Sequence, residues 1–495
     1  FGTKRRSIIT NMGGGLMQLV AYGAQDIYLT GNPQITFFKV VYRRHTNFSV
    51  EAVEQTFNGN VNFGMRNVVC QIARVGDLVT NMYLKCTVSG GTATAEADEW
   101  AWCSMLGHSM IDEVELEIGG TKIDRQYGQW MEIWHQLARN PQHDRGYNEM
   151  VGHTAGATSM SRSHDAMELF VPLQFFCCRN DGLALPLIAL QYHDVRVNFN
   201  FRALSELQNR RGTAPTCSIT SASLLVDYVY LDSEERKRFA QASHEYLIET
   251  LQYTGAESVH SNSAKPRLGM NHPNKALFWV TALGSVRGEP QWGVDDADAT
   301  NRYVLDNAKK SVSGDEFVDD SDEKLSPGEG LVFDAGRNGG GDENTFNSLG
   351  AEATSGGAQF STSGVLPGST TGGSTVVWAH NCFATQLRDG ANPTKDAQLQ
   401  LNGHDRFSRQ SGAYFNFVQP FQHFSNTPSN GVNVYSFALN PEDHQPSGTC
   451  NMSRIDNATL SVNYADDTDG NLCIYGLAYN VLRIMSGMGG LAYSN

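Results

Sequence analysis

The stretch Val195-Arg-Val-Asn-Phe-Asn-Phe-Arg202 alternates strictly between apolar and polar residues over eight positions. Successive side chains of a β-strand point to opposite faces of a sheet, so this pattern predicts a strand with one face in a core. Similar short apolar or alternating runs, separated by Gly, Asp and Asn, recur along the chain at residues 68–72, 78–88, 114–118, 223–231 and 458–464. The chain is therefore predicted to be rich in β-structure.

Helical signals are few. One amphipathic helix is predicted just before Asn140-Pro141, because apolar residues recur there with helical spacing at Tyr127, Trp130, Met131, Trp134 and Leu137. A second, short and charged helix is predicted to run through Ala242, because Asp232 can cap its amino end and Glu235 follows three residues later. The fold class is thus predicted to be all-β with few short helices.

The order of the signals repeats once along the chain. In each half a strand leads through a loop to a strand-turn segment and then to an alternating strand, at residues 78–88, 115–125 and 195–201 and again at 276–281, 398–406 and 458–464. Two eight-stranded antiparallel β-sandwiches, side by side, account for this repeat and for the length of 495 residues. The predicted organisation is an N-terminal arm (1–22), a first domain (23–232), a linker helix (233–245) and a second domain (246–495).

Residues 287–380 break the pattern and form a predicted insertion in the second domain. They are rich in Gly, Ser, Thr and Asp and contain 16 acidic and 6 basic residues, so they contribute −10 of the net charge of −15. Such a composition buries too little apolar surface to offset the entropy of ordering the chain. We expect a flexible surface loop.

The composition excludes several classes of protein. The net charge of −15 argues against a general nucleic-acid binder, which needs a basic surface. No apolar run approaches the ~20 residues of a membrane-spanning helix. The nine cysteines are odd in number and form no Cys-x-x-Cys pair, so reduced thiols are expected.

No catalytic, cofactor or metal site is predicted. Gly107-His-Ser-Met-Ile111 lacks the closing Gly of a nucleophile elbow, and the 14 histidines include no zinc-binding pair at the usual spacing. His193-Asp194 and His404-Asp405 are expected to make turn or interface hydrogen bonds. The Gly-rich segment 485–491 lacks the order of a phosphate-binding loop. Asn47, Asn451 and Asn457 begin glycosylation sequons, a weak signal because such triplets often arise by chance.

Residues 23–48 carry aromatic and basic residues without catalytic chemistry. An extended run at 27–30 is expected to end in a turn at Gly31-Asn32-Pro33. A bulky strand or buried turn is expected next, followed by positive charge; its assembly-arm candidates are Phe37, Phe38, Tyr42, Arg43 and Arg44. We expect an arm that docks its aromatic residues into a body and leaves a basic cluster on one surface.

The same stretch closely resembles the N-terminal signature of the major capsid proteins of large icosahedral double-stranded DNA viruses, above all those that infect algae. The resemblance continues in order through Leu401-Asn-Gly-His-Asp-Arg-Phe407 and through residues 186–194, 244–249, 446–457 and 479–493. It implies a double jelly roll and a structural role rather than an enzyme. It also implies homotrimeric, pseudo-hexagonal capsomers that tile the shell of the virion.

The implied partners are neighbouring capsomers, minor capsid proteins and penton proteins. An internal membrane would be contacted only indirectly, nucleic acid would not be contacted directly, and assembly would take place in the host cytoplasm. Without the resemblance, a carbohydrate-binding or host-receptor-binding β-sandwich is the alternative, because sandwich folds host many functions.

Overall fold

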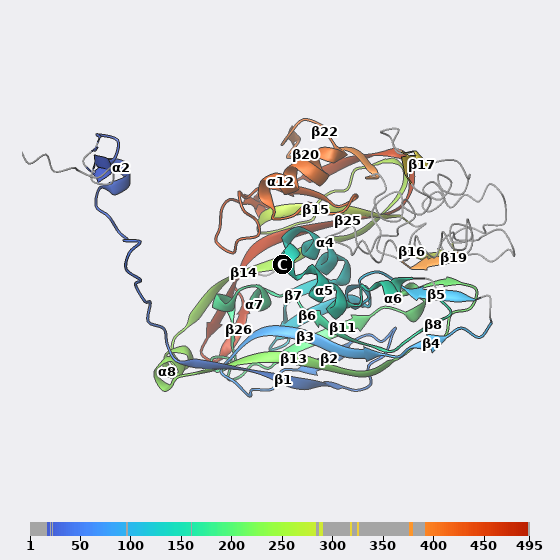
Figure 1. Ribbon diagram of the computed structural model, residues 1–495, viewed down its shortest axis with the longest axis horizontal. Helices are drawn as coiled ribbons and strands as arrows, with labels where there is room; N and C mark the ends of the chain where they lie inside the picture. Colours follow the sequence, from blue (N-terminus) through green and yellow to red (C-terminus); the bar gives the residue numbers. More distant parts are fainter. Residues whose placement is uncertain are drawn as a thin grey trace, which may run out of the picture. The chain divides into compact units, whose positions relative to one another are not determined.

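The computed structural model describes residues 17–19, 21, 23–95, 98–159, 161–283, 287–290, 317–318, 324–325, 376–379 and 392–493. Most of the predicted insertion at 287–380 therefore lies outside the described residues. The chain divides into two units, Phe1–Asn47 and Phe48–Asn495, and each is considered by itself. The larger unit contains two curled sheets (Figure 1).

The first curled sheet has the strand order β10-β3-β13-β1-β2-β11-β6-β7, with β9 paired to β3. Its strands are β1 (Phe48–Asn58), β2 (Val68–Gln71), β3 (Leu78–Val88), β6 (Ile111–Ile118), β7 (Thr121–Tyr127), β9 (Met167–Pro172), β10 (Leu185–Pro186), β11 (Val195–Phe201) and β13 (Ile219–Leu231). Residues 48–56 of β1 pair with β13 and residues 57–58 pair with β2, so β1 joins the two halves of the sheet. The halves enclose one apolar core. As predicted, β11 buries alternate residues, Val195, Val197, Phe199 and Phe201.

The second curled sheet has the order β21-β20-β25-β15-β23. Its strands are β14 (His244–Ala264), β15 (Pro273–Leu283), β20 (Thr394–Leu401), β21 (His404–Asp405), β22 (Gln410–Ser411), β23 (Asn433–Ser436), β24 (Cys450–Asn451), β25 (Ala458–Met485) and β26 (Met488–Leu491). The strand predicted at 458–464 is only the start of β25, because the chain continues from its pairing with β20 into pairings with β14 and β15. The two sheets, each of nine strands when short edge strands are counted, confirm the double jelly roll.

The repeated plan is visible in two matching hairpins. β6 and β7 are joined by Gly119-Gly120, and β20 and β21 by Asn402-Gly403; all four residues have positive φ, between 51° and 83°. Two-residue turns of this kind match the twist of the flanking strands, and Asn-Gly and Gly-Gly are the residues that tolerate them. Each hairpin then pairs with an alternating strand, β11 in the first domain and the start of β25 in the second. The internal repeat predicted from the sequence is confirmed at this level.

The described α-helices of the larger unit are α3 (Leu106–Ser109), α4 (Gly128–Ala138), α5 (Asp144–Val151), α6 (Ala155–Thr158), α7 (Phe176–Arg179), α8 (Ser233–Gln241) and α12 (Gln419–His423). α4 is the predicted amphipathic helix. α8 is the predicted charged helix, and the Asp232 carboxylate accepts a hydrogen bond from the Ser233 amide at 2.6 Å. Within the described residues, no helix is both long and apolar enough to cross a membrane.

A small sheet connects the loops of the two domains. β5 (Glu99–Trp102) and β12 (Gln208–Arg211) belong to the first domain, whereas β16 (Arg287–Pro290) and β19 (Val376–Ala379) lie at the two ends of the predicted insertion. The order is β16-β19-β12-β5. The two ends of the insertion therefore share one sheet with β5, which lies in the loop between β3 and β6 of the first domain, and β12 stands between them. Minor pairs are β4 (Gly91–Thr92) with β8 (Ser163–His164) and β17 (Phe317–Val318) with β18 (Lys324–Leu325).

The smaller unit corrects one prediction. Residues 27–30 form the short helix α2 (Ile27–Thr30) rather than an extended run. The Thr30 amide donates to the Asp26 carbonyl at 2.8 Å and the Gly31 amide donates to the Ile27 carbonyl at 2.9 Å. These local hydrogen bonds satisfy the backbone where no neighbouring strand is present to do so.

Candidate assembly surfaces and interdomain junction

The arm candidates are exposed. Phe37, Phe38 and Tyr42 are 87%, 97% and 85% accessible, and no strand forms around them. The predicted strand is therefore absent, and the rings are exposed rather than buried in a turn. The docking of the arm into a body stays a prediction. Arg43 and Arg44 are also exposed, so the arm presents aromatic rings and positive charge together.

The three sequon asparagines are exposed as well. Asn451 accepts a hydrogen bond from the Ser453 amide at 3.1 Å, and Asn457 accepts one from the Thr459 hydroxyl at 3.4 Å. Their accessibility is compatible with modification, which stays a prediction.

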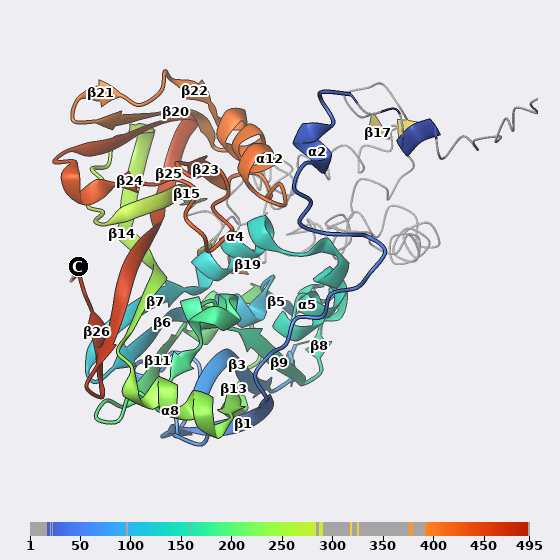
Figure 2. The same ribbon diagram turned by 90° about the vertical axis from the view of Figure 1, so that its left-hand side faces the viewer.

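An aromatic layer joins the two domains. One face of α4 is buried against the second sheet, and Figure 2 shows this helix lying between the two domains. The layer consists of Trp130, Ile133, Trp134 and Leu137 from α4 with Leu251, Ala276, Phe278, Val280, Phe424, Val432, Val434, Cys473, Tyr475 and Leu477 from the second domain. The Trp130 and Phe278 rings meet edge to face at 4.9 Å. Burial of large aromatic groups on this scale fixes the two domains in one body.

A buried ion cluster lies at the same junction. Glu249 on β14 pairs with Arg179 on α7 of the first domain at 2.9 Å and with Lys275 on β15 at 2.6 Å. The Lys275 ammonium is fully buried and also donates to the Asp443 carbonyl at 2.7 Å. Burial by itself would raise the pKa of Glu249, but Arg179, His444 and Lys275 together lower it to about 2. The carboxylate is therefore charged at neutral pH and links both domains.

A second carboxylate at the junction behaves differently. Asp124 on β7 is buried, and its Oδ1 accepts hydrogen bonds from the Leu251 and Arg125 amides, each at 3.0 Å. Its Oδ2 accepts one from the Gln126 side chain at 2.9 Å. Burial raises the pKa of Asp124 to about 6 in spite of these donors and of the nearby Arg179. Because Leu251 belongs to β14, this side chain ties the backbone of the second domain to the first.

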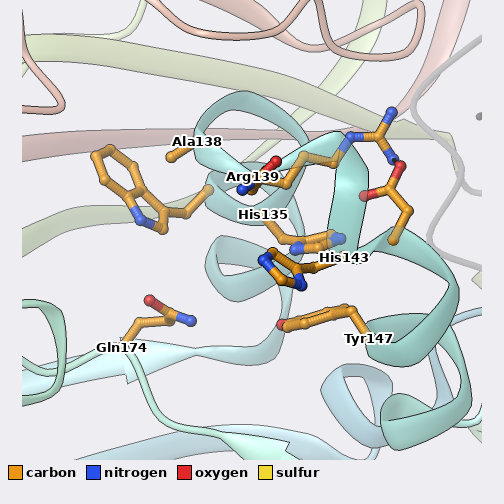
Figure 3. A pocket seen from close by; sticks show the side chains of 9 residues that line it. His135, Ala138, Arg139, His143, Tyr147 and Gln174 are labelled. Carbon is orange, nitrogen blue, oxygen red and sulfur yellow. Dashed lines mark ion pairs between the residues drawn. The ribbon is translucent and has the colours of Figure 1, made fainter.

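A cavity of about 220 Å³ opens beside α4 and α5. It is lined by Trp134, His135, Ala138, Arg139, Asn140, His143, Asp144, Tyr147 and Gln174. Arg139 forms an ion pair with Asp144 at 2.8 Å. Figure 3 shows Arg139 on one wall and Gln174 across the cavity. The rings of His135 and Tyr147 stack at 3.7 Å, and the Tyr147 hydroxyl bonds His108 Nε2 at 2.7 Å. Burial lowers the pKa of both His108 and His135 to about 3, so they are neutral at pH 7.

These groups form no recognisable catalytic arrangement. No Ser, Thr or Cys lines the cavity. Ser109, from the Gly107–Ile111 motif, is buried and its hydroxyl donates to the Ser104 carbonyl at 3.1 Å. In the described part of the chain, no group of three or more His, Cys, Asp or Glu side chains could hold a metal ion. None of the eight cysteines described there forms a disulfide bond.

The two His-Asp pairs make the predicted kind of contact. His193 Nδ1 lies 3.0 Å from the Gly489 carbonyl and so connects a first-domain loop to the C-terminal hairpin. Asp405 accepts a hydrogen bond from the Gln400 side chain at 2.8 Å in the β20–β21 turn. Sequence reasoning missed the ion cluster, because Arg179, Glu249 and Lys275 come from three separate segments. A lysine beside the apolar run Ala276-Leu-Phe-Trp279 was the one available signal.

Comparison with known proteins gives one consistent result. Residues 36–232 match the family model described as major capsid protein N-terminus, and residues 235–490 match that of the large eukaryotic DNA virus major capsid protein. The major capsid proteins of Phaeocystis pouchetii virus and Pyramimonas orientalis virus are 45% and 43% identical; each alignment covers 98% of this chain and all of the relative.

Solved structures agree with the sequence comparison. A chain of the PBCV-1 virus capsid, described as a quasi-atomic model, is 34% identical with a TM-score of 0.68, covering 93% of this chain and 100% of that one. The Faustovirus major capsid protein is 12% identical with a TM-score of 0.63, covering 94% of each chain, and at this identity it supports the fold alone.

Proposed function

The chain belongs to the major capsid proteins of large eukaryotic DNA viruses, and on that basis we propose that its working form is a homotrimer, the pseudo-hexagonal capsomer of an icosahedral shell. As a member of this family it is a structural protein of the virion capsid. The carbohydrate-binding alternative is not favoured, because both family models and the near full-length relatives are capsid proteins.

The trimer proposal rests on one observation: the chain contains two jelly rolls built on the same plan of strands, and the contacts between them are extensive and buried. The α4 layer and the Arg179–Glu249–Lys275 cluster hold the two domains in a fixed relation within each chain. Three such chains around an axis present six similar units. Closed cyclic symmetry is the usual outcome for identical subunits, and it requires no ligand.

Further partners follow from this role. Neighbouring capsomers contact the trimer through smaller and more polar surfaces than those inside the trimer. Minor capsid and penton proteins complete the shell. We propose that the arm, with Phe37, Phe38, Tyr42, Arg43 and Arg44, serves these assembly contacts, since its aromatic rings are exposed and lie beside positive charge. The internal membrane is contacted only indirectly and nucleic acid not directly, and assembly takes place in the host cytoplasm.

Size-exclusion chromatography with light scattering on the purified full-length chain tests the trimer. The expected mass is three times that of the 54.3 kDa chain, without added metal or nucleotide. A single monomeric species at micromolar concentration would overturn the proposal.

A further inference from the structure

One helical surface of the second domain is strongly apolar. The π-helix η5 (Tyr414–Val418) runs into α12, and Phe417 and Phe421 lie four residues apart on the same face. Phe421 is 84% exposed and Leu439, on the loop after β23, is 70% exposed. His423 at the end of α12 lies 2.9 Å from the Leu439 carbonyl, which brings the loop to the helix. We call Phe417, Val418, Phe421 and Leu439 the α12 patch.

The opposite side of this helix is firmly anchored. Phe415 is fully buried and meets Trp279 edge to face at 4.9 Å. Asn416 is also fully buried, and its side chain donates to the Ser429 and Val432 carbonyls at 3.0 and 2.8 Å. A helix held in this way presents its outer side chains at fixed positions, so little ordering entropy is lost when a partner covers them.

The first domain carries a second surface with apolar residues, on the outer face of strand β13. Along β13, Leu224, Val226 and Tyr228 are buried in the core. The alternate residues Leu225, Val229 and Leu231 point to the outer face, where they are only half-buried. Alternation normally places polar residues on the outer face of a sandwich. Here Ser223 and Asp227 share that face with three large aliphatic side chains, which therefore form a local apolar cluster that a partner could cover.

β1 extends that outer face. Val50 pairs with Val229 and Ala52 pairs with Asp227, so both side chains share the outer face; Val50 is 55% exposed. We call Val50, Ala52, Leu225, Val229 and Leu231 the β1 face. Figure 1 and Figure 2 both show β1 and α12 far apart, β1 on the first sheet and α12 on the second domain.

The symmetry of a ring of identical chains determines which surfaces can contact each other. In a closed ring of three, each contact is heterologous, because one surface of a chain meets a different surface of the next chain. Such a ring needs two separate patches that match, one on each flank. An aromatic side chain offers roughly 200 Å² to bury, so Phe417 and Phe421 together expose on the order of 250 Å². This exposed aromatic area could form the apolar centre of an interface that buries about 800 Å² per partner.

We propose that the α12 patch of one copy packs against the β1 face of the next copy and thereby closes the ring. This inference rests on the proposed trimer and identifies the surfaces that form it. The second domain of each copy then contacts the first domain of its neighbour, and the same contact is made three times. The partner is a second copy of this chain because both surfaces belong to a capsid protein that assembles with its own kind.

The test uses two full-length variants, each with one patch disabled. Variant A carries Phe421→Asp and Leu439→Asp; variant B carries Val50→Asp and Leu231→Ser. Each alone should run as a monomer in sedimentation velocity at tens of micromolar, where the wild-type chain runs as a trimer. Mixed in equal amounts they should form a two-chain species, because B still has an α12 patch and A still has a β1 face. One contact can form but the ring cannot close.

Other outcomes distinguish an incorrect ring contact from an incorrect trimer proposal. If B alone forms dimers, the α12 patch pairs with itself and the inference is wrong. It is also wrong if either variant remains trimeric, or if the mixture stays monomeric. A wild-type chain that is monomeric contradicts the proposed trimer instead. Circular dichroism melts check folding, and Phe421→Ser and Val50→Thr provide milder substitutes, each expected to weaken the trimer at least tenfold. Tyr192→Ser, at an exposed aromatic residue outside both patches, is the control and should stay trimeric.

Discussion

Asp124 and Glu249 are both buried carboxylates at the interdomain junction, yet their surroundings shift their pKa values in opposite directions. Glu249 has Arg179 and Lys275 within 3 Å, and these cations outweigh the effect of burial. Asp124 has hydrogen-bond donors but no ion pair within the described residues, so burial dominates and raises its pKa to about 6. A full charge at close range compensates desolvation better than amide donors do. Glu249 stabilises the charged junction, whereas ionised Asp124 costs stability.

The pKa of Asp124 has a definite consequence for stability. A carboxyl whose pKa rises from 3.8 to about 6 on folding binds its proton more tightly in the folded state. The contribution of Asp124 to the free energy of unfolding therefore rises as the pH falls from 7 through 6. At pH values well above 6, the ionised side chain lowers the free energy of unfolding by on the order of 3 kcal/mol. Asp124→Asn should remove this part of the pH dependence. Urea unfolding between pH 5 and 7.5, at fixed protein concentration, should show a smaller slope for the variant.

The exposed Asp165→Asn is the matched control and should keep the wild-type slope. Equal slopes for wild type and Asp124→Asn would contradict the prediction. None of this could be predicted from the sequence. Asp124 stands in a strand of mostly polar residues, β7, and its backbone contact with β14 of the other domain forms only in the folded protein.

At the scale of elements, the prediction succeeded where burial follows from local pattern. β11 alternates as its sequence does, α4 follows the spacing of its aromatic residues, and α8 begins at the predicted cap. It failed at residues 27–30, where a short helix replaces the predicted extended run, and at residues 37–42, where the apolar residues were predicted to form a strand or buried turn and are exposed instead. The rule that apolar residues are buried assumes a core within the same chain. A segment whose apolar residues are exposed in one copy fails that assumption.

The arm gives a prediction at the same scale. Phe37→Ser together with Phe38→Ser should leave the thermal midpoint of the trimer unchanged within about 2 °C, because neither ring is buried and surface changes rarely exceed ~0.5 kcal/mol. Shell formation should fall sharply, as judged by electron microscopy of assembly reactions or of particles from expressing cells. Deleting residues 1–30 should likewise leave the β-type circular dichroism intact.

Two outcomes would argue against an assembly role. Loss of folding on truncation would show that the arm belongs to the core. Normal particles from the Phe37→Ser, Phe38→Ser variant would show that its rings are dispensable for assembly.

At the scale of the whole molecule, the repeat in the sequence predicted two domains with the same order of strands. The matching β6–β7 and β20–β21 hairpins explain why the sequence was sufficient for this prediction. Turn residues and alternating strands are local features, and they recur where the plan recurs. The junction between the domains was not foreseeable, because the α4 layer and the ion cluster join residues from separate segments of the chain. The β1 face shares this property, since β1 and β13 meet only in the folded sheet.

The acidic insertion supplies the last prediction. Its ends, β16 and β19, join the sheet that contains β5 and β12 of the first domain, so loops of both domains meet in one sheet. A segment with a net charge of −10 would repel its copies if it were packed between capsomers, whereas outside the shell water and salt screen it. We therefore expect it on the outward face. Deleting residues 310–375, between β16 and β19, should leave the trimer intact in light scattering, and limited proteolysis of whole particles should cut first within this segment. A deletion that abolishes the trimer would place the segment in the interface, and particles that resist cleavage throughout it would place it inside the shell.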